Sequence, residues 1–197
     1  MPLPGTAIEA CDARDPFCQN PVTPEVMTDA RGIAHLFVPG SFTGFYGILR
    51  SDSYPTLYYA GRLLAGEPHV TYPVAPDNYA LSAVLSLNGV VPNRDPNVKQ
   101  GLMVLTAYDC LDRAASGVTF ELTNSTAPLT FYIHNHIPSS TASETDSEGT
   151  GGFVDAPEGI TDFVSNLPNG HRLTGSVFVR AASGTFVDVR PRVRDLP

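Results

Sequence analysis

Apolar and polar residues alternate with a period of two in short runs along this chain, and turn residues separate the runs. The clearest run is 118–123, in which every second residue is apolar, and similar runs lie at 102–107 and 131–136. Such alternation is typical of strands. The chain contains 18 prolines and 17 glycines, which interrupt helices but suit turns between strands. The pattern therefore predicts an all-β fold.

The first half contains weaker runs of the same kind, among them 34–38 and 44–50. One segment differs, because 79–87 is mostly apolar without alternation. Asp77 or Asn78 can cap its start, and the sequence Asn-Gly at 88–89 can end it. We therefore expect one short helix here, followed by a connector rich in proline and asparagine.

A short phrase occurs twice, as Thr-Asp-Ala-Arg-Gly at 28–32 and as Thr-Asp-Ser-Glu-Gly at 145–149. In each copy the aspartate can accept a hydrogen bond from the backbone two residues later, and the glycine can supply a positive φ. A repeat of this kind predicts two copies of one β-domain with equivalent hairpin turns. The structural turn residues are Asp29, Gly32, Asp146 and Gly149.

The first phrase, the Leu-Phe-Val-Pro-Gly run at 36–40, the aromatic strand at 44–50 and the Ser-Tyr-Pro turn at 53–55 together resemble the carboxypeptidase regulatory-like domain. That domain is a seven-stranded prealbumin-like (transthyretin-like) sandwich. Residues 101–191 resemble a related module of bacterial secreted proteins and lipoproteins, through stretches such as Ala-Ser-Gly-Val-Thr-Phe-Glu-Leu at 115–122.

This resemblance implies two tandem prealbumin-like, Ig-like β-sandwiches with one short connecting helix. The first sandwich is expected at 1–75, the connector with the helix at 76–100, and the second sandwich at 101–197. The resemblance also implies a non-catalytic module of an exported protein, located outside the cell, on the outer-membrane surface or in the periplasm. Such a module acts as a structural, adhesion or ligand-binding segment, and no cofactor is expected.

The charge of the chain narrows the range of partners. The net charge is −8, from 20 acidic and 12 basic residues, which disfavours binding to nucleic acid or to an anionic membrane surface. No run approaches the ~18 apolar residues that a membrane-spanning helix needs. The N-terminus does not have the basic and apolar regions of a signal peptide, so we expect no export signal in this chain.

For the module that the resemblance implies, we expect an extracellular protein or a glycan as the partner. The sequence carries no signal for an oligomeric state. A carbohydrate-binding module is a second alternative function, because tyrosines are frequent in the first half and aromatic rings suit a partly buried binding face. These tyrosines are Tyr46, Tyr54, Tyr58, Tyr59 and Tyr72.

The three cysteines predict one disulfide. Cys11 and Cys18 enclose a short polar loop, which favours a bridge between them over two buried thiols or a zinc site. Cys110 has no obvious partner, and we expect it to be free, as a small apolar residue at a strand end.

Tyr132, His134 and His136 form the sharpest candidate site. On a strand, a period of two places all three side chains on one face, where they could bind a transition metal. Intradiol ring-cleavage dioxygenases bind iron through two tyrosines and two histidines on a related sandwich, which gives a metal-binding protein or metalloenzyme as the first alternative function. The Arg-Pro that precedes the histidine pair in that family is absent here, and no second tyrosine can be assigned.

The competing interpretation of this pair is a solvated polar face. If Phe131 and Ile133 fill the core, both histidines point outward onto that face. Motifs for a nucleophile or a phosphate loop are absent from the sequence. Asp146, Glu148 and Asp155 do not follow the spacing of a calcium loop, and turn chemistry explains the first of them. We therefore expect no catalytic centre.

Overall fold

The structure is a computed structural model that describes residues 4–40, 42–49, 56–59, 86, 95, 97–123 and 129–191. The strands in these residues are β1 (Ala7–Asp12), β2 (Val26–Met27), β3 (Gly44–Leu49), β4 (Thr56–Tyr59), β5 (Gln100–Ala107), β6 (Thr119–Leu122), β7 (Leu129–His134), β8 (Ile137–Ser139), β9 (Thr150–Pro157), β10 (Gly159–Asn166), β11 (Arg172–Val179) and β12 (Gly184–Val189). The all-β prediction is therefore confirmed for the described part of the chain.

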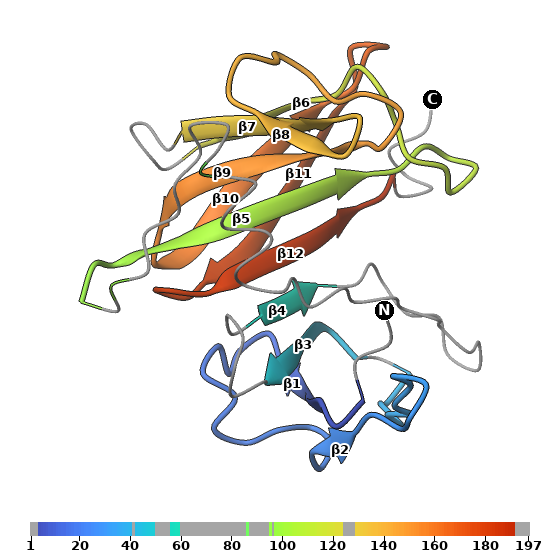
Figure 1. Ribbon diagram of the computed structural model, residues 1–197, viewed down its shortest axis with the longest axis vertical. Helices are drawn as coiled ribbons and strands as arrows, with labels where there is room; N and C mark the ends of the chain where they lie inside the picture. The colour runs from blue at the N-terminus through green and yellow to red at the C-terminus, as the bar shows by residue number, and fades with distance from the viewer. Residues whose placement is uncertain are drawn as a thin grey trace.

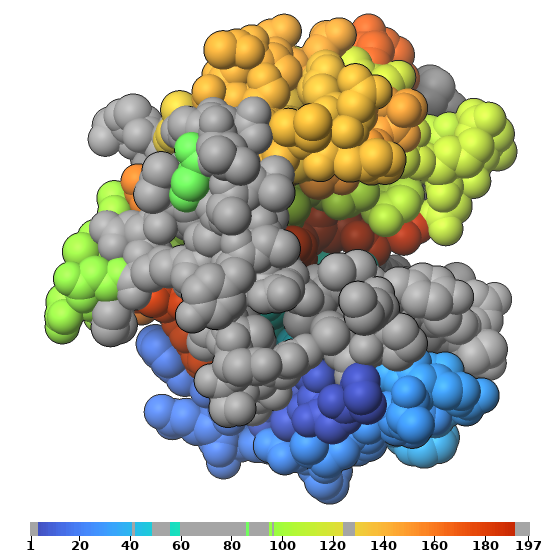
Figure 2. Space-filling model, viewed as in Figure 1, coloured from blue at the N-terminus to red at the C-terminus, as the bar shows by residue number. Residues whose placement is uncertain are grey.

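The strands form two sheets. The large sheet has nine strands in the order β2-β1-β3-β4-β12-β5-β9-β7-β8, and the small sheet has three in the order β11-β10-β6. The small sheet packs behind the β5, β9 and β7 part of the large one (Figure 1). The first-half strands β1 to β3 lie at one end of the molecule, opposite the β7–β8 hairpin, as the colours in the space-filling view also show (Figure 2).

Strands β5 to β12 build a β-sandwich. Its core contains side chains from both sheets, including Met103 and Leu105 from β5, Phe120 from β6 and Phe163 from β10. Leu102 and Phe131 lie in a separate buried cluster on the opposite face of the large sheet. Both faces of β5 are therefore buried, which explains why this strand is an almost continuous apolar run.

The first half joins the second through β4. This strand pairs antiparallel with β3 on one side and parallel with β12 on the other, with Tyr58 opposite Phe186. Strand β12 also pairs parallel with β5. The large sheet therefore contains strands from both halves.

The tandem arrangement of two separate sandwiches is not confirmed. Among the described residues, β1 to β4 contribute one layer, because β4 finds its second neighbour in β12 and not within the first half. The boundaries at 1–75, 76–100 and 101–197 stay predictions. Most of the expected helix at 79–87 lies outside the described residues; Ser86 is described and is helical.

The strand expected at 34–38 does not form. This segment has no ladder partner, and Phe37 is 90% exposed. The expected partner of this segment is the strand before the 29–32 turn, but β2 has only two residues and pairs with β1 alone among the described strands.

The repeated phrase forms the same local turn in both places. The Asp29 carboxylate accepts a hydrogen bond from Arg31 N at 2.8 Å, and the Asp146 carboxylate accepts one from Glu148 N at 2.8 Å. Gly32 and Gly149 have φ values of 75° and 66°. This is the expected Asx-turn chemistry.

The two turns nevertheless occupy different places in the fold. The first follows the edge strand β2 and leads into a segment without pairing, whereas the second precedes the interior strand β9. A third turn of the same kind begins at Asp109, with Asp112 at a φ of 62° where the other turns have glycine. The expectation of equivalent hairpin turns is therefore wrong: the repeat reflects local turn chemistry and not two matching positions.

Candidate functional site

The β7–β8 hairpin contains the three residues of the candidate metal site. Strand β7 ends at His134, which pairs with Ile137 at the start of β8. Asn135 and His136 form the two-residue turn between them, with φ values of 51° and 64°. Two positive φ angles are the signature of a type I′ hairpin turn. His136 therefore lies in the turn and not on the strand face where we expected it.

Tyr132 points into the sandwich core. Its side chain is 3% exposed, its ring stacks on Phe120 with centroids 5.9 Å apart, and its hydroxyl accepts a hydrogen bond from Phe120 N at 3.0 Å. Burial raises the pKa of this hydroxyl. We expected this face of β7 to point outward, which is wrong. Both faces of the sheet are buried here, since Tyr132 packs in the sandwich core and Phe131 packs in the cluster on the other side.

The two histidines contact different partners. The Nε2 atom of His134, at the end of β7, lies 2.8 Å from the carbonyl oxygen of Glu144. The Nδ1 atom of His136 lies 2.7 Å from Glu148 Oε1, and its side chain is 90% exposed. The three expected ligands are thus divided among the core, a strand end and an exposed turn.

Two carboxylates from the 146–149 turn bind the backbone of the hairpin turn. Asp146 Oδ2 accepts a hydrogen bond from Asn135 N at 2.9 Å, and Glu148 Oε1 accepts one from His136 N at 2.7 Å. Burial acts to raise the pKa of Asp146, but the backbone N–H groups of Glu148 and Asn135 outweigh it and hold that pKa below its usual range. These acids therefore stabilise a turn, which is the role that turn chemistry predicts for Asp146.

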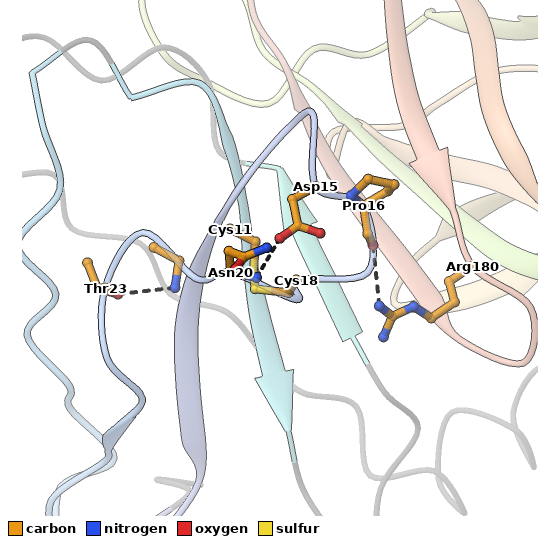
Figure 3. The surroundings of a disulfide bond; sticks show 8 residues. Cys11, Asp15, Pro16, Cys18, Asn20, Thr23 and Arg180 are labelled. Atoms are coloured by element: carbon orange, nitrogen blue, oxygen red, sulfur yellow. Dashed lines mark hydrogen bonds between the residues drawn. A yellow bond between two sulfur atoms is a disulfide. The ribbon is translucent and has the colours of Figure 1, made fainter.

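Cys11 and Cys18 are joined by a disulfide, the pairing expected from their spacing, with Cα atoms 5.3 Å apart (Figure 3). Glu9 lies close enough to both sulfur atoms for the three residues to form a metal-binding group. The sulfur atoms are bonded to each other, however, and a metal requires free thiolates. Cys110 is free and exposed in the turn after Asp109, so it does not pack at a strand end as we expected.

The disulfide loop contacts the sandwich, a relationship that the sequence analysis missed. The Phe17 ring packs edge-on against Phe178 of β11, with centroids 5.3 Å apart. The Arg180 guanidinium lies 5.4 Å from the Phe17 centroid and donates a hydrogen bond to the Pro16 carbonyl oxygen at 3.3 Å. These contacts join residues more than 160 positions apart, and no local pattern signals them.

The tyrosines of β4 do not form one binding face. Tyr59 packs against the sandwich core, and its hydroxyl accepts a hydrogen bond from Phe178 N at 3.2 Å. Tyr58, its neighbour, has a pKa raised by burial and by the Asp188 carboxylate. Adjacent strand residues point to opposite faces of a sheet. Tyr46 is half-buried on β3; Tyr54 and Tyr72 lie outside the described residues.

Asp188 belongs to a charged cluster at the end of β12. Arg190 forms ion pairs with Asp188, at 3.2 Å, and with Asp112. Its guanidinium also lies 4.0 Å from the centroid of the Tyr108 ring. The cluster ties the end of β12 to the segment after β5, and its charges are directed at each other.

A shallow hollow of about 530 Å³ lies against the small sheet. It is lined by Thr123, Asp162, Phe163, Val164, Thr174, Gly175 and Ser176. The Ser176 hydroxyl donates a hydrogen bond to the Asp162 carboxylate. Among the lining residues the Asp162 carboxylate is the one ionisable group, and its hydrogen bond with Ser176 ties β10 to β11.

No protein-family model matches the chain, and no curated protein matches it. Among solved structures, a streptococcal ancillary pilin is similar over 93% of this chain, with 13% sequence identity and a TM-score of 0.31. The chain covers 60% of the length of that pilin. Within the described residues, no helix is long and apolar enough to cross a membrane.

Proposed function

We propose that this chain is a non-catalytic extracellular β-sandwich module of an exported protein, in which it acts as a structural, adhesion or ligand-binding segment. The observation that carries the proposal is the separation of Tyr132, His134 and His136. Their polar atoms interact with Phe120 N, with a backbone carbonyl and with a turn carboxylate, instead of converging on one point. Catalysis and metal binding both require convergence.

The Cys11–Cys18 disulfide supports the extracellular part of the proposal. Disulfides persist in secreted and periplasmic proteins and are rare in a reducing cytosol. Here the bond closes a surface loop that contains two turns, at 12–15 and 15–18. A module that sits outside the cell gains stability from such a bond without any catalytic use of the cysteines.

The proposal extends to the family. We propose that β5 to β12 form a prealbumin-like module of the carboxypeptidase regulatory-like type, from a bacterial secreted protein or lipoprotein. A second copy in the first half is part of the same proposal. The resemblance in the sequence motifs supports both statements.

Metal content tests the non-catalytic proposal. Protein purified without a histidine tag or chelating resin should contain no stoichiometric transition metal. His134→Ala and His136→Ala should not change the metal content. Stoichiometric iron or zinc that disappears in either variant would contradict the proposal and favour the metalloenzyme alternative.

Binding and thiol measurements test the remaining parts. A glycan array separates the carbohydrate-binding alternative from a purely structural role, with Tyr46→Ala as the matched variant. Thiol titration of denatured, unreduced protein from its native cell should give one reactive group, Cys110. Three reactive groups would show that the protein matures in a reducing compartment.

A further inference from the structure

The loop between Cys11 and Cys18 connects the two halves of the molecule. At the tip of the loop, Phe17 packs against Phe178 of β11. Pro16 accepts a hydrogen bond from Arg180, which directly follows β11 (Figure 3). Phe17 remains 53% exposed in this position. The tip therefore rests on the sandwich surface and is not part of the core.

The tip contacts are few and individually weak. They consist of one edge-on aromatic pair, one cation–π contact and one hydrogen bond at 3.3 Å. Exposed contacts of these types each contribute little, and each must offset the entropy of ordering the loop. The tip consequently depends on an independent constraint that orders the loop before it meets β11.

The disulfide is that constraint. Cys11 is fully buried on β1 in a cluster with Phe45 and Leu57, so one end of the bond is fixed in the first half. Cys18 directly follows Phe17 and has a φ of 52°, a conformation that side chains other than glycine adopt at a cost. Its N–H bonds to Asp15 O at 2.9 Å, and Asp15 N bonds to Asp12 O, at the end of β1, at 2.9 Å. These turns shape the loop, and the disulfide is its covalent link to β1.

We propose that the Cys11–Cys18 disulfide is a redox-sensitive clasp between the two halves. In the oxidised protein it holds Pro16 and Phe17 on Phe178 and Arg180. In the reduced protein the tip leaves β11, and the Phe178 ring and Arg180 guanidinium become available to solvent or to a partner. The two sheets stay folded, because only Asp12 of the loop belongs to a ladder, and the Tyr59–Phe178 hydrogen bond does not involve the loop.

The opening step requires a dithiol reductant. One thiolate of the reductant attacks the half-buried Cys18 sulfur, because the Cys11 sulfur is inaccessible. The bond between the two protein sulfurs breaks and a mixed disulfide forms. The second thiolate of the reductant then displaces Cys18, which leaves two protein thiols and an oxidised reductant. Two electrons and two protons pass to the protein.

Tryptophan fluorescence tests the clasp directly, because the natural sequence contains no tryptophan. Phe17→Trp places a reporter on the tip, and Phe178→Trp places one beneath it. Phe186→Trp is the matched control, because Phe186 packs against the buried cluster on the opposite face of the sheet. Emission wavelength is the readout, since intensity also responds to quenching by the neighbouring disulfide.

We expect dithiothreitol to shift the emission of Phe17→Trp and Phe178→Trp to longer wavelength and to leave Phe186→Trp unchanged. Thiol titration must show three free thiols in the reduced samples. The Cys11→Ser/Cys18→Ser double substitution should reproduce both shifts without reductant. Far-ultraviolet circular dichroism should show that the sheets remain.

Two results would overturn the proposal. Unchanged emission of both tip reporters, with three thiols titrated, would show that the contacts survive without the disulfide. A shift of all three reporters with loss of the circular dichroism signal would show that the bond is a general staple of the fold. Phe17 is exposed, so Phe17→Trp reports even if Phe178→Trp fails to fold.

Discussion

The hydroxyl of Tyr132 on β7 accepts a hydrogen bond from the backbone N–H of Phe120 on β6, across the interior of the sandwich. Strand β6 lies at the edge of the small sheet, where its only ladder partner among the described strands is β10. A tyrosine from the opposite sheet therefore satisfies a buried N–H group of an edge strand. The bond ties the two layers of the sandwich together.

Tyr132→Phe should lower the free energy of unfolding by about 1–3 kcal/mol, because it leaves a buried N–H group without an acceptor. The ring and its stack on Phe120 are retained, so packing changes little. Urea unfolding monitored by circular dichroism gives the measurement. A loss below about 0.5 kcal/mol, the range of ordinary surface substitutions, would show that the N–H finds another acceptor.

Gly149→Ala should be much more destabilising than Gly170→Ala. Both glycines have positive φ, which costs alanine about 1–2 kcal/mol. At Gly149 an added Cβ would also lie 2.5 Å from the Ala107 carbonyl oxygen, whereas at Gly170 nothing lies within 4 Å. We expect Gly149→Ala to cost at least about 2 kcal/mol more than Gly170→Ala, since the strand backbone must move. Equal losses in thermal or urea unfolding would contradict this steric explanation.

The Asp146 carboxylate should make stability depend on pH in the acid range. Its pKa in the folded protein is below the usual 3.8, so its contribution is present above that value and is lost as the pH falls through the folded pKa. Asp146→Asn removes the charge and should reduce the fall in urea midpoint between pH 5 and pH 2.5 relative to wild type. An identical fall in both proteins would show that Asp146 does not contribute.

Tyr59 should couple the unfolding of the two halves. It packs against both the first-half cluster and the sandwich core, and its hydroxyl bonds to Phe178 N. We expect one calorimetric transition in the wild type, with matching calorimetric and van't Hoff enthalpies. Tyr59→Ala should cost about 3 kcal/mol and separate the transition into two.

The control for this substitution is Phe37→Ala, which removes a 90% exposed ring from the first half. It should change stability by less than about 0.5 kcal/mol and leave one transition. Two transitions in the wild type would contradict the coupling through Tyr59.

Features that depend on a few neighbouring residues could be predicted from the sequence. The alternation at 118–123 predicts β6. A strand with one buried and one exposed face shows a period of two in its own sequence, whatever it pairs with. The turns at Asp29 and Asp146 follow from a carboxylate and a glycine three residues apart. The Cys11–Cys18 pairing follows from a loop short enough to bring the two Cα atoms together.

The pairing of strand edges and the burial of strand faces depended on how distant segments packed together. Residues 34–38 have strand-like composition, but they form no ladder with β2 or with any other described strand. Tyr132 packs in the sandwich core and Phe131 packs in the cluster on the other face of the same sheet. Alternation shows that the two side chains point to opposite faces, but it does not show that both faces are buried. The parallel pairing of β4 with β12 and the contact of Phe17 with Phe178 join distant segments. Their energy comes from burial between surfaces that exist only after the chain has folded, so no local pattern contains them.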